Sequence, residues 1–326
     1  MSIRLTIGFG DNPRIQPLKD GTVKPDSIEL AFRESRNLFY HNLAIDDLDC
    51  SEMSISETIL ARERTDGTKW DWTAVPIFMS RAYGWTGLLV NPTSGIETLA
   101  DLKGKRVAVP DYDMTFALWM RCTLKDLYGI EASDITWYNI RTRGESHGLA
   151  LALEKDPPPG ITLHWFTPGM DAAAMLDRGE LDAACIPMPP GGEGNPRIRK
   201  LLPDGGQAVI TEHYRKMGVL QTNHHVIVQN RIVQEHPWVP MELYNAFERA
   251  KAVSYERARQ HQSAYLYFPG TDFWEQAAVF GEDPYPFGIN MMRPMLDRLF
   301  QGSLEQGLIR KPITVEDVYH STTLDT

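Results

Sequence analysis

The sequence predicts an α/β protein whose two lobes close on each other as a hinged clamshell. Strand-like and helix-like patterns alternate over the first two thirds of the 326 residues, which is typical of a mostly parallel sheet with helical crossovers. The pattern restarts after turn residues at positions 91–95. A late apolar run at positions 224–229 returns the chain to the first lobe, so two segments cross the hinge.

The first lobe is expected to alternate strands with helices. The expected segments are a strand at 3–9, a helix at 35–43, a strand at 50–54, a helix at 57–63, and two short apolar runs at 75–79 and 86–91. Two amphipathic helices, at 239–255 and 291–305, follow the late apolar run. We therefore assign residues 1–90 and 226–326 to the first lobe, residues 91–225 to the second, and the ligand cleft to the space between them.

The second lobe starts with a charged turn, a buried strand and a helix start within residues 101–115, DLKGKRVAVPDYDMT. Asp111 or Asp113 is placed to cap that helix, whose free N–H groups would favour a carboxylate or phosphate ligand. The expected segments of this lobe are a strand at 106–109, a helix at 114–128, a strand at 135–140, a helix at 170–178 and a strand at 181–186.

Two segments carry a resemblance to a known fold. Residues 101–110 and residues 176–184, LDRGELDAA, resemble the start of the second lobe and a later helix-to-strand step of type II periplasmic binding proteins. This resemblance implies the clamshell fold. It says little about chemistry, because one fold supports many activities.

Composition and charge exclude several classes of protein. The net charge of -10 and the lack of a run rich in Lys and Arg argue against nucleic-acid binding, which needs a clustered basic face. The amino terminus enters a strand without an apolar signal region, and no later segment approaches the roughly 20 apolar residues of a membrane span. Three widely spaced cysteines suit buried reduced thiols. We expect a cytoplasmic protein with no membrane partner.

A closer resemblance runs along almost the whole chain. The segments that carry it are 18–23 (LKDGTV), 52–56 (EMSIS), 78–81 (FMSR), 112–115 (YDMT) with Trp119, His224 before 226–228 (VIV), 236–239 (HPWV) and 283–288 (DPYPFG). Together they resemble the cytoplasmic 4,5-dihydroxyphthalate decarboxylase family. The resemblance implies a binding-protein fold that removes one carboxyl group from a dihydroxylated aromatic diacid, giving protocatechuate, in phthalate degradation.

One segment departs from that family's pattern. After Ser80 and Arg81 the chain reads YGWT at 83–86, where the family is expected to carry an arginine and a histidine. A cation and an imidazole are therefore missing from a strand expected to face the cleft. Activity on a differently substituted hydroxylated aromatic acid stays open.

Two arginines are candidate carboxylate ligands. Arg14 lies in the loop after the first strand, where its guanidinium would grip a carboxylate through two bonds; the alternative is a surface pair with Asp11 or Asp20. Ser80 and Arg81 lie between two apolar runs and are candidate substrate contacts, and an arginine so placed needs a partner if it is buried. A substrate carboxylate would be such a partner.

Hydroxyl groups gather at two expected helix starts. Ser54 ends the second strand, and either a helix cap or a ligand contact suits it. Tyr112 and Thr115 flank the helix start of the second lobe, where an anion would bind. Trp119 lies one turn further on and is expected either to stack on an aromatic ligand or to fill the core.

Charged side chains in two loops are further candidates. Arg141 and Glu145 belong to a mixed-charge cluster with Arg143 and His147 that is either a cleft wall or a solvated loop. Asp283 sits in a proline-rich loop, which it either caps or uses to accept a proton from a phenol.

His224 would face the cleft, and an imidazole there carries protons near neutral pH. Its neighbour His225 points the other way if the segment is a strand. This spacing does not suit a shared metal, so neither a metal site nor a cofactor is predicted.

The decarboxylation that the family resemblance implies requires an acid, a base and a cation that holds the second carboxylate. His224 and Glu145 are the candidate acid and base, and Arg14 and Arg81 are the candidate clamps for the substrate's carboxylates. The partner is a small aromatic carboxylate, and a homo-oligomer is left open. The rival interpretations are a non-catalytic solute-binding protein for an organic acid and another lyase on the same fold.

Overall fold

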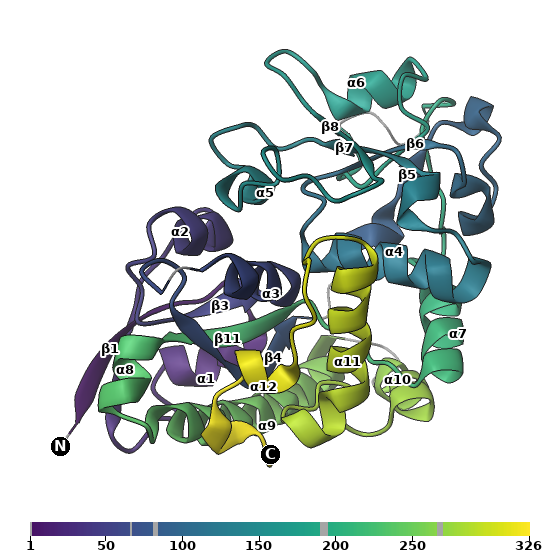
Figure 1. Ribbon diagram of the computed structural model, residues 1–326. Helices are drawn as coiled ribbons and strands as arrows, with labels where there is room; N and C mark the ends of the chain where they lie inside the picture. Colours follow the sequence, from purple (N-terminus) through teal and green to yellow (C-terminus); the bar gives the residue numbers. More distant parts are fainter. Residues whose placement is uncertain (1, 66, 81–83, 190–194, 266–269) are drawn as a thin grey trace.

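The computed structural model describes residues 2–65, 67–80, 84–189, 195–265 and 270–326. Two sheets lie one above the other, and helices cover and join them (Figure 1). The predicted α/β class with two lobes is confirmed. Both chain ends lie beside the first sheet (Figure 1).

The first sheet has five strands in the order β2-β1-β3-β11-β4. Their bounds are β1 Ile3–Gly8, β2 Ile28–Phe32, β3 Cys50–Ser54, β4 Trp72–Ser80 and β11 His224–Gln229. The strands β1, β2 and β3 are parallel, whereas β11 runs antiparallel to both of its neighbours. The carboxyl ends of β1, β3 and β4 and the start of β11 therefore meet at one edge of the sheet.

The second sheet has six strands in the order β10-β5-β9-β6-β7-β8. Their bounds are β5 Leu89–Val90, β6 Arg106–Val109, β7 Thr136–Asn139, β8 Thr162–Trp165, β9 Ala183–Ala184 and β10 Arg199–Lys200. The strand β5 pairs here, although the sequence placed it at the end of the first lobe, and His224 begins a strand of the first sheet. The division of the chain at residues 90 and 226 stays a prediction.

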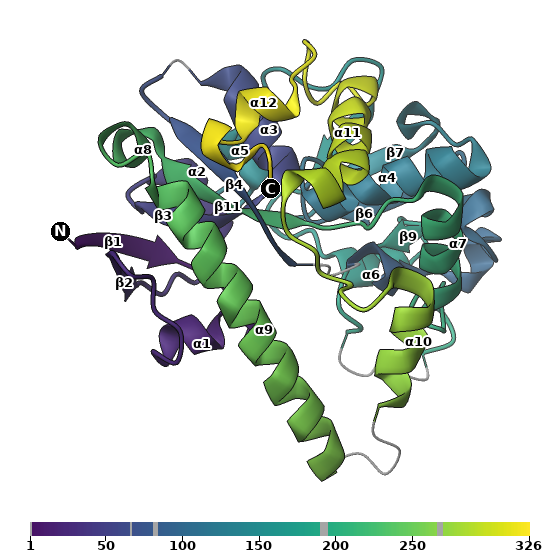
Figure 2. The same cartoon turned by 90° about the horizontal axis from the view of Figure 1, so that it is seen from below.

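Helices follow most of the strands. Those nearest the first sheet are α1 Gln16–Lys19, α2 Leu38–Ala44, α3 Ile55–Arg64, α8 Asn230–Glu235, α9 Val239–Tyr265 and α12 Val315–Val318. Those that follow strands of the second sheet are α4 Thr115–Tyr128, α5 His147–Ala150, α6 Ala172–Asp177 and α7 Gln207–Met217. The helices α10 Thr271–Phe280 and α11 Ile289–Glu305 complete the chain. In Figure 2, α9 runs as one long rod under the first sheet and α10 stands near α7.

One hydrophobic core runs through both lobes. It includes Leu5 and Ile77 of the first sheet, Leu118 of α4, Trp137 of the second sheet and Leu299 of α11, all buried. A smaller cluster lies between α6 and the second sheet. The three cysteines are buried free thiols, as the sequence predicted.

The start of α4 differs from expectation. Its first turn is preceded by Met114, and no side chain caps it. Asp111 instead accepts hydrogen bonds from Ser146 and His147, and Asp113 has no hydrogen-bond partner among the described residues. The predicted cap was wrong because the Asp111 carboxylate binds a segment more than 30 residues further along the chain, and the Asp113 carboxylate accepts no hydrogen bond from the helix N–H groups.

Candidate active site

Three candidate residues meet at the edge of the first sheet. His224, at the start of β11, is in register with Ser54 on one side and Ser80 on the other. The next residue, His225, lies on the opposite face, where Tyr319 and Thr58 bind its two ring nitrogens at 2.8 Å each. The strand therefore turns one imidazole toward the second lobe and buries the other.

His224 is held by a carboxylate. Its Nδ1 lies 2.7 Å from Oε1 of Glu52 on β3, and the Gly10 N–H donates to Oε2 of the same carboxylate at 3.1 Å. The Glu52 side chain is 6% exposed and the His224 side chain 20% exposed. Nε2 of His224 has no protein partner in the described part of the chain and is the nitrogen left for a ligand.

The charge state of Glu52 follows from its neighbours. Burial alone would raise its pKa, but the hydrogen bond and charge of His224, the Gly10 N–H and the nearby Arg14 outweigh burial and lower it. Glu52 is therefore ionised at neutral pH. A carboxylate in this position fixes the imidazole ring and balances the positive charge that the ring acquires when it carries a proton.

Arg14 lies at the same edge of the sheet. Its Nη2 donates to the carbonyl oxygen of Met79, the residue before Ser80, and its guanidinium carbon lies 3.9 Å from the centre of the Tyr285 ring. Asn12 donates to the same carbonyl at 2.8 Å. The guanidinium is thus anchored on one side and stacked on an aromatic face.

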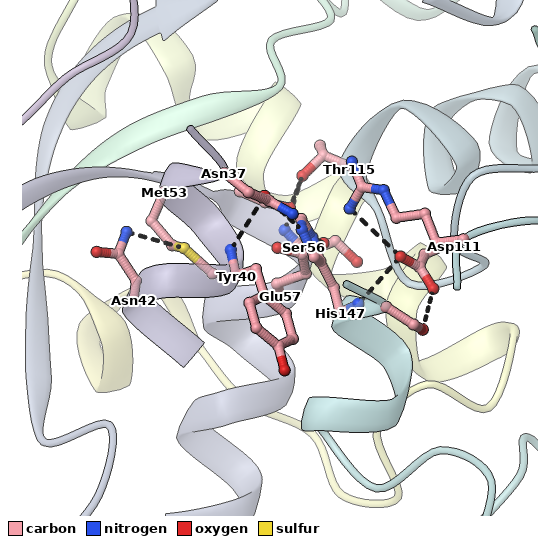
Figure 3. Close-up of polar contacts among 12 residues, drawn as sticks. Asn37, Tyr40, Asn42, Met53, Ser56, Glu57, Asp111, Thr115 and His147 are labelled. Carbon is pink, nitrogen blue, oxygen red and sulfur yellow. Dashed lines mark hydrogen bonds and ion pairs between the residues drawn. The ribbon is translucent and has the colours of Figure 1, made fainter. Parts of the chain in front are cut away.

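A second histidine–carboxylate pair bridges the two lobes. Nδ1 of His147, on α5, lies 2.8 Å from Oε1 of Glu57 on α3, and its Nε2 lies 3.3 Å from Oδ1 of Asn37 (Figure 3). Both side chains are fully buried. The ring of Phe39 contacts both imidazoles, with centroid distances of 4.5 Å to His224 and 6.3 Å to His147.

Two further carboxylates approach this bridge from the second lobe. Asp111 accepts from the Ser146 hydroxyl at 2.5 Å and from the His147 N–H at 3.0 Å, and pairs with Arg141 at 3.3 Å. Burial raises the pKa of Asp111 despite these partners. Burial, with the charges of Asp111 and Glu57, raises the pKa of Asp113 well above its usual range.

Hydroxyl groups join the start of α4 to the first lobe. The Thr115 hydroxyl lies 2.8 Å from the Ser54 hydroxyl and accepts from the Ser56 N–H at 3.0 Å. Figure 3 shows Ser56 and Thr115 facing each other across this junction. Ser54 and Thr115, proposed from the sequence to hold an anion, contact each other in this structure.

The structure places the other candidates outside this edge. Tyr112 is buried, with the Arg121 guanidinium 3.6 Å from its ring centre, and Trp119 is a buried residue that donates to the Thr222 carbonyl at 2.9 Å. Glu145 is exposed. Asp283 accepts from Lys251 and Tyr255. Arg81 lies outside the described residues.

Some of the contacts at this junction could not be read from the sequence. Glu57 and His147 are 90 positions apart, and Asn37 and His147 are 110 positions apart. His147 stood out by sequence as a member of a mixed-charge cluster, but no local pattern pairs it with Glu57. Phe39 carried no signal beyond its place in an expected helix.

Two classes of feature are absent from the described residues. Among them, His, Cys, Asp and Glu side chains nowhere gather in threes in an arrangement that would hold a metal ion. Within the same ranges, no helix has the length and apolar character needed to cross a membrane.

Comparison with curated proteins finds two relatives with the same description. The chain is 29% identical over 333 residues to a 4,5-dihydroxyphthalate decarboxylase of Comamonas testosteroni, covering 99% of this chain and 98% of the relative. It is 32% identical over 219 residues to a 4,5-dihydroxyphthalate decarboxylase of Pseudomonas putida, covering 66% of this chain and 83% of the relative. No family model matches the chain.

Two solved structures with the same fold are sulfonate-binding proteins. The periplasmic aliphatic sulphonate binding protein of Escherichia coli superposes with a TM-score of 0.55 at 16% identity over 100% of both chains. An alkanesulfonate-binding protein of Xanthomonas axonopodis pv. citri, bound to MOPS, gives a TM-score of 0.50 at 15% identity over 97% of both chains. At these identities the likeness shows the fold alone, and it is the predicted binding-protein fold.

Proposed function

Because this chain belongs to the 4,5-dihydroxyphthalate decarboxylase family, we propose that it decarboxylates 4,5-dihydroxyphthalate to 3,4-dihydroxybenzoate, protocatechuate. The observation that carries the proposal is the match to the Comamonas relative over 99% of this chain. The site adds a partly exposed imidazole that is held by a buried carboxylate at the edge of the first sheet.

The substrate's own substitution pattern favours this reaction. Each hydroxyl of the ring is para to a carbon that bears a carboxylate, and it pushes electron density onto that carbon. The carbon takes a proton while the hydroxyl loses one, which gives a dienone-like intermediate. The bond to the carboxylate then breaks, carbon dioxide leaves, the bonding electrons restore the aromatic ring, and the oxygen regains its proton. The net reaction consumes one proton.

His224 is the proposed proton carrier. Glu52 occupies Nδ1, so Nε2 is the atom that would deliver the proton to the ring carbon. The other sequence-based candidate, Glu145, is exposed. Among the described residues it forms no hydrogen bond or ion pair with His224 or His147. Arg14 is the proposed clamp for the carboxylate that the product retains.

The test is a panel of ring acids incubated with the purified protein, with carbon dioxide release and product followed together. We expect release from 4,5-dihydroxyphthalate and none from phthalate, which lacks the electron-donating hydroxyls. Binding of hydroxylated acids without carbon dioxide release would contradict the proposal and fit a solute-binding protein. Release only from a different hydroxylated acid would retain the reaction class and correct the substrate.

A further inference from the structure

A cavity of about 280 Å³ opens beside Arg14, between η1 (Pro13–Ile15), α9, α10 and the loop before α11. Its wall includes Arg14, Tyr255, Arg259, Phe273, Gln276 and Tyr285. Figure 2 shows the far half of α9 and the helix α10 on either side of this region. Small-molecule sites usually measure roughly 300–1,000 Å³, so this cavity suits a single substituted ring.

Arg14 connects this cavity with the His224 edge of the sheet. Its Nη2 donates to the carbonyl of Met79, whose neighbour Ser80 is in register with His224. Its Nε–H is buried and has no acceptor among the described residues. A guanidinium anchored at one nitrogen and stacked on Tyr285 keeps further N–H groups for a planar carboxylate.

A network of hydrogen bonds braces the aromatic wall. Asp283 accepts from the Tyr255 hydroxyl at 2.7 Å, from the Tyr285 N–H at 2.9 Å and from Lys251 Nζ at 2.8 Å. Nζ of the buried Lys251 also donates to the Tyr285 carbonyl at 3.0 Å. The two tyrosines are thus held in place before a ligand arrives. Binding therefore loses less conformational entropy, because these side chains are already ordered.

The charges at the cavity match a ring that carries both acids and hydroxyls. Arg14 and the exposed Arg259 line it together with Asp272 and Glu282, so the formal charges balance. A dicarboxylate without hydroxyls would still pair with the two arginines. Carboxylates facing the arginines and hydroxyls facing the acidic side chains would each find a hydrogen-bonding partner of the right kind.

We propose that this cavity binds the ring of an aromatic dicarboxylate, with Arg14 gripping the carboxylate that the product retains and Tyr285 positioning Arg14. The inference rests on the proposed function for the identity of that carboxylate. It assigns substrate selection to the wall formed by α9, α10 and the loop that carries Tyr285. Proton transfer stays with His224.

The test is equilibrium binding of phthalate, an unreactive aromatic dicarboxylate, measured by titration calorimetry. We expect Arg14→Gln to weaken binding about 10- to 100-fold, the loss expected when hydrogen bonds to a charged group are removed. Tyr285→Leu should weaken binding several-fold, since Arg14 loses its stacking surface. Tyr285→Phe keeps the ring and should bind within about twofold of the native protein.

Arg257→Gln is the matched control. Arg257 lies on α9 two positions from Arg259 but binds Asp20 and Thr22, away from the cavity. Arg259→Gln should weaken phthalate binding measurably, and Arg257→Gln should not. Circular dichroism and thermal unfolding establish that each variant is folded, and Tyr285→Leu against Tyr285→Phe serves as a second test if Arg14→Gln fails to fold.

The outcomes separate this inference from the proposed function. Failure of the native protein to bind phthalate would rule out the cavity as the subsite. The same conclusion would follow if the folded Arg14→Gln and Tyr285→Leu variants bound phthalate as tightly as Arg257→Gln. Both conclusions hold whether or not the native protein releases carbon dioxide. If the native protein releases none from hydroxylated acids while these variants lose phthalate affinity, the decarboxylase proposal fails and the dicarboxylate site stands.

Discussion

At the scale of single residues, two adjacent histidines have opposite surroundings. His224 gives Nδ1 to Glu52 and keeps Nε2 for a ligand, whereas Tyr319 and Thr58 occupy both ring nitrogens of His225. A proton carrier needs one nitrogen that a substrate can reach. Only His224 meets this condition, and His225 contributes to stability.

Replacing His224 should separate chemistry from binding. We expect His224→Ala to lower kcat on the order of 10²- to 10⁴-fold, the usual contribution of a general acid or base, while phthalate affinity stays within about tenfold. Steady-state carbon dioxide release and calorimetry measure the two effects. Glu52→Gln should lower kcat less and alter its pH profile, because the imidazole loses its charged partner. His164→Ala, on the exposed strand β8, is the control, and near-native turnover by His224→Ala would remove His224 from the mechanism.

His225 should make stability depend on pH. Burial, with a smaller effect of the neighbouring His224, lowers the pKa of His225 from 6.5 to about 3. Between these values the unfolded chain binds a proton that the folded chain does not, so stability falls as pH falls through this window. The slope from one such group is about 1.4 kcal/mol per pH unit.

The comparison with His225→Gln isolates this contribution. Urea unfolding at several pH values between 6 and 4 should give a shallower loss of stability in the variant, by about one bound proton. Equal slopes for the two proteins would mean that His225 is protonated in the folded state.

Resemblance to a family made His224 a candidate, but the sequence could not supply its neighbours. The contact between Glu52 and His224 spans 172 positions. Such pairings depend on which strands become neighbours. That information is absent from the local pattern that predicts a strand.

At the scale of elements, β11 and α4 determine where the site forms. The strand β11 inserts between β3 and β4 and brings His224 beside Ser54 and Ser80. The helix α4 begins at Thr115, whose hydroxyl binds both Ser54 and the Ser56 backbone. One side chain therefore links the first turn of α4 to the strand end and helix start of the other lobe.

Removing that hydroxyl should destabilise the junction. Thr115→Val keeps the shape of the side chain but leaves the buried Ser56 N–H without its acceptor. We expect the free energy of unfolding to fall by about 1–3 kcal/mol, the usual cost of an unsatisfied buried polar group. Urea unfolding measures the change, and Thr162→Val on the exposed strand β8 should have little effect. An equal, small change in both variants would contradict the assigned role of Thr115.

Elements with strong patterns were predicted and weak ones were not. The sequence placed the strand at 50–54 as found and the helix at 114–128 within one residue. The helix α7 was missed because it buries little, with Val209 and His213 as its buried residues. The strand expected at 181–186 shortens to β9 Ala183–Ala184, because pairing with β5 and β6 reaches only these two residues.

At the scale of the whole molecule, one aspartate joins three helices. Asp126 of α4 accepts from Arg298 of α11 at 2.8–3.2 Å and contacts His213 of α7 at 3.0 Å. The side chains of Asp126 and Arg298 are 8% and 9% exposed. Together with the shared core, this contact couples the carboxyl-terminal helices to the second lobe.

Breaking this contact should cost far more than breaking a surface pair. Asp126→Ala leaves the charge of Arg298 buried without its main partner, and we expect a loss of about 3–5 kcal/mol in the free energy of unfolding. Glu316→Ala breaks the exposed pair with Arg293 on the same helix α11 and should cost less than about 1 kcal/mol. Urea unfolding of the two variants provides the comparison. Similar losses in the free energy of unfolding would show that Asp126 does not couple α11 to α4 as described.

The sequence predicted two lobes but not how they share a core. Strand and helix periodicity together with a turn-rich break predicted two α/β units. The packing of α11 against α4 involves buried residues far apart in sequence, such as Leu118 and Leu299, and periodicity does not reveal partners. The expected boundaries at residues 90 and 226 remain the proposed division.

The position of β11 in the first sheet has a consequence for how the chain matures on the ribosome. The strands β3 and β4 are complete by residue 80, yet the strand that joins them begins at residue 224. Protein synthesis adds roughly 5–20 residues per second, so on the order of 10 s pass before β11 is made. During this time the edges of β3 and β4 that will pair with β11 stay unpaired. All six strands of the second sheet emerge during that wait. The lobe encoded in the middle is therefore free to fold first, and the sheet edge that carries the candidate site closes after it, when His224 arrives.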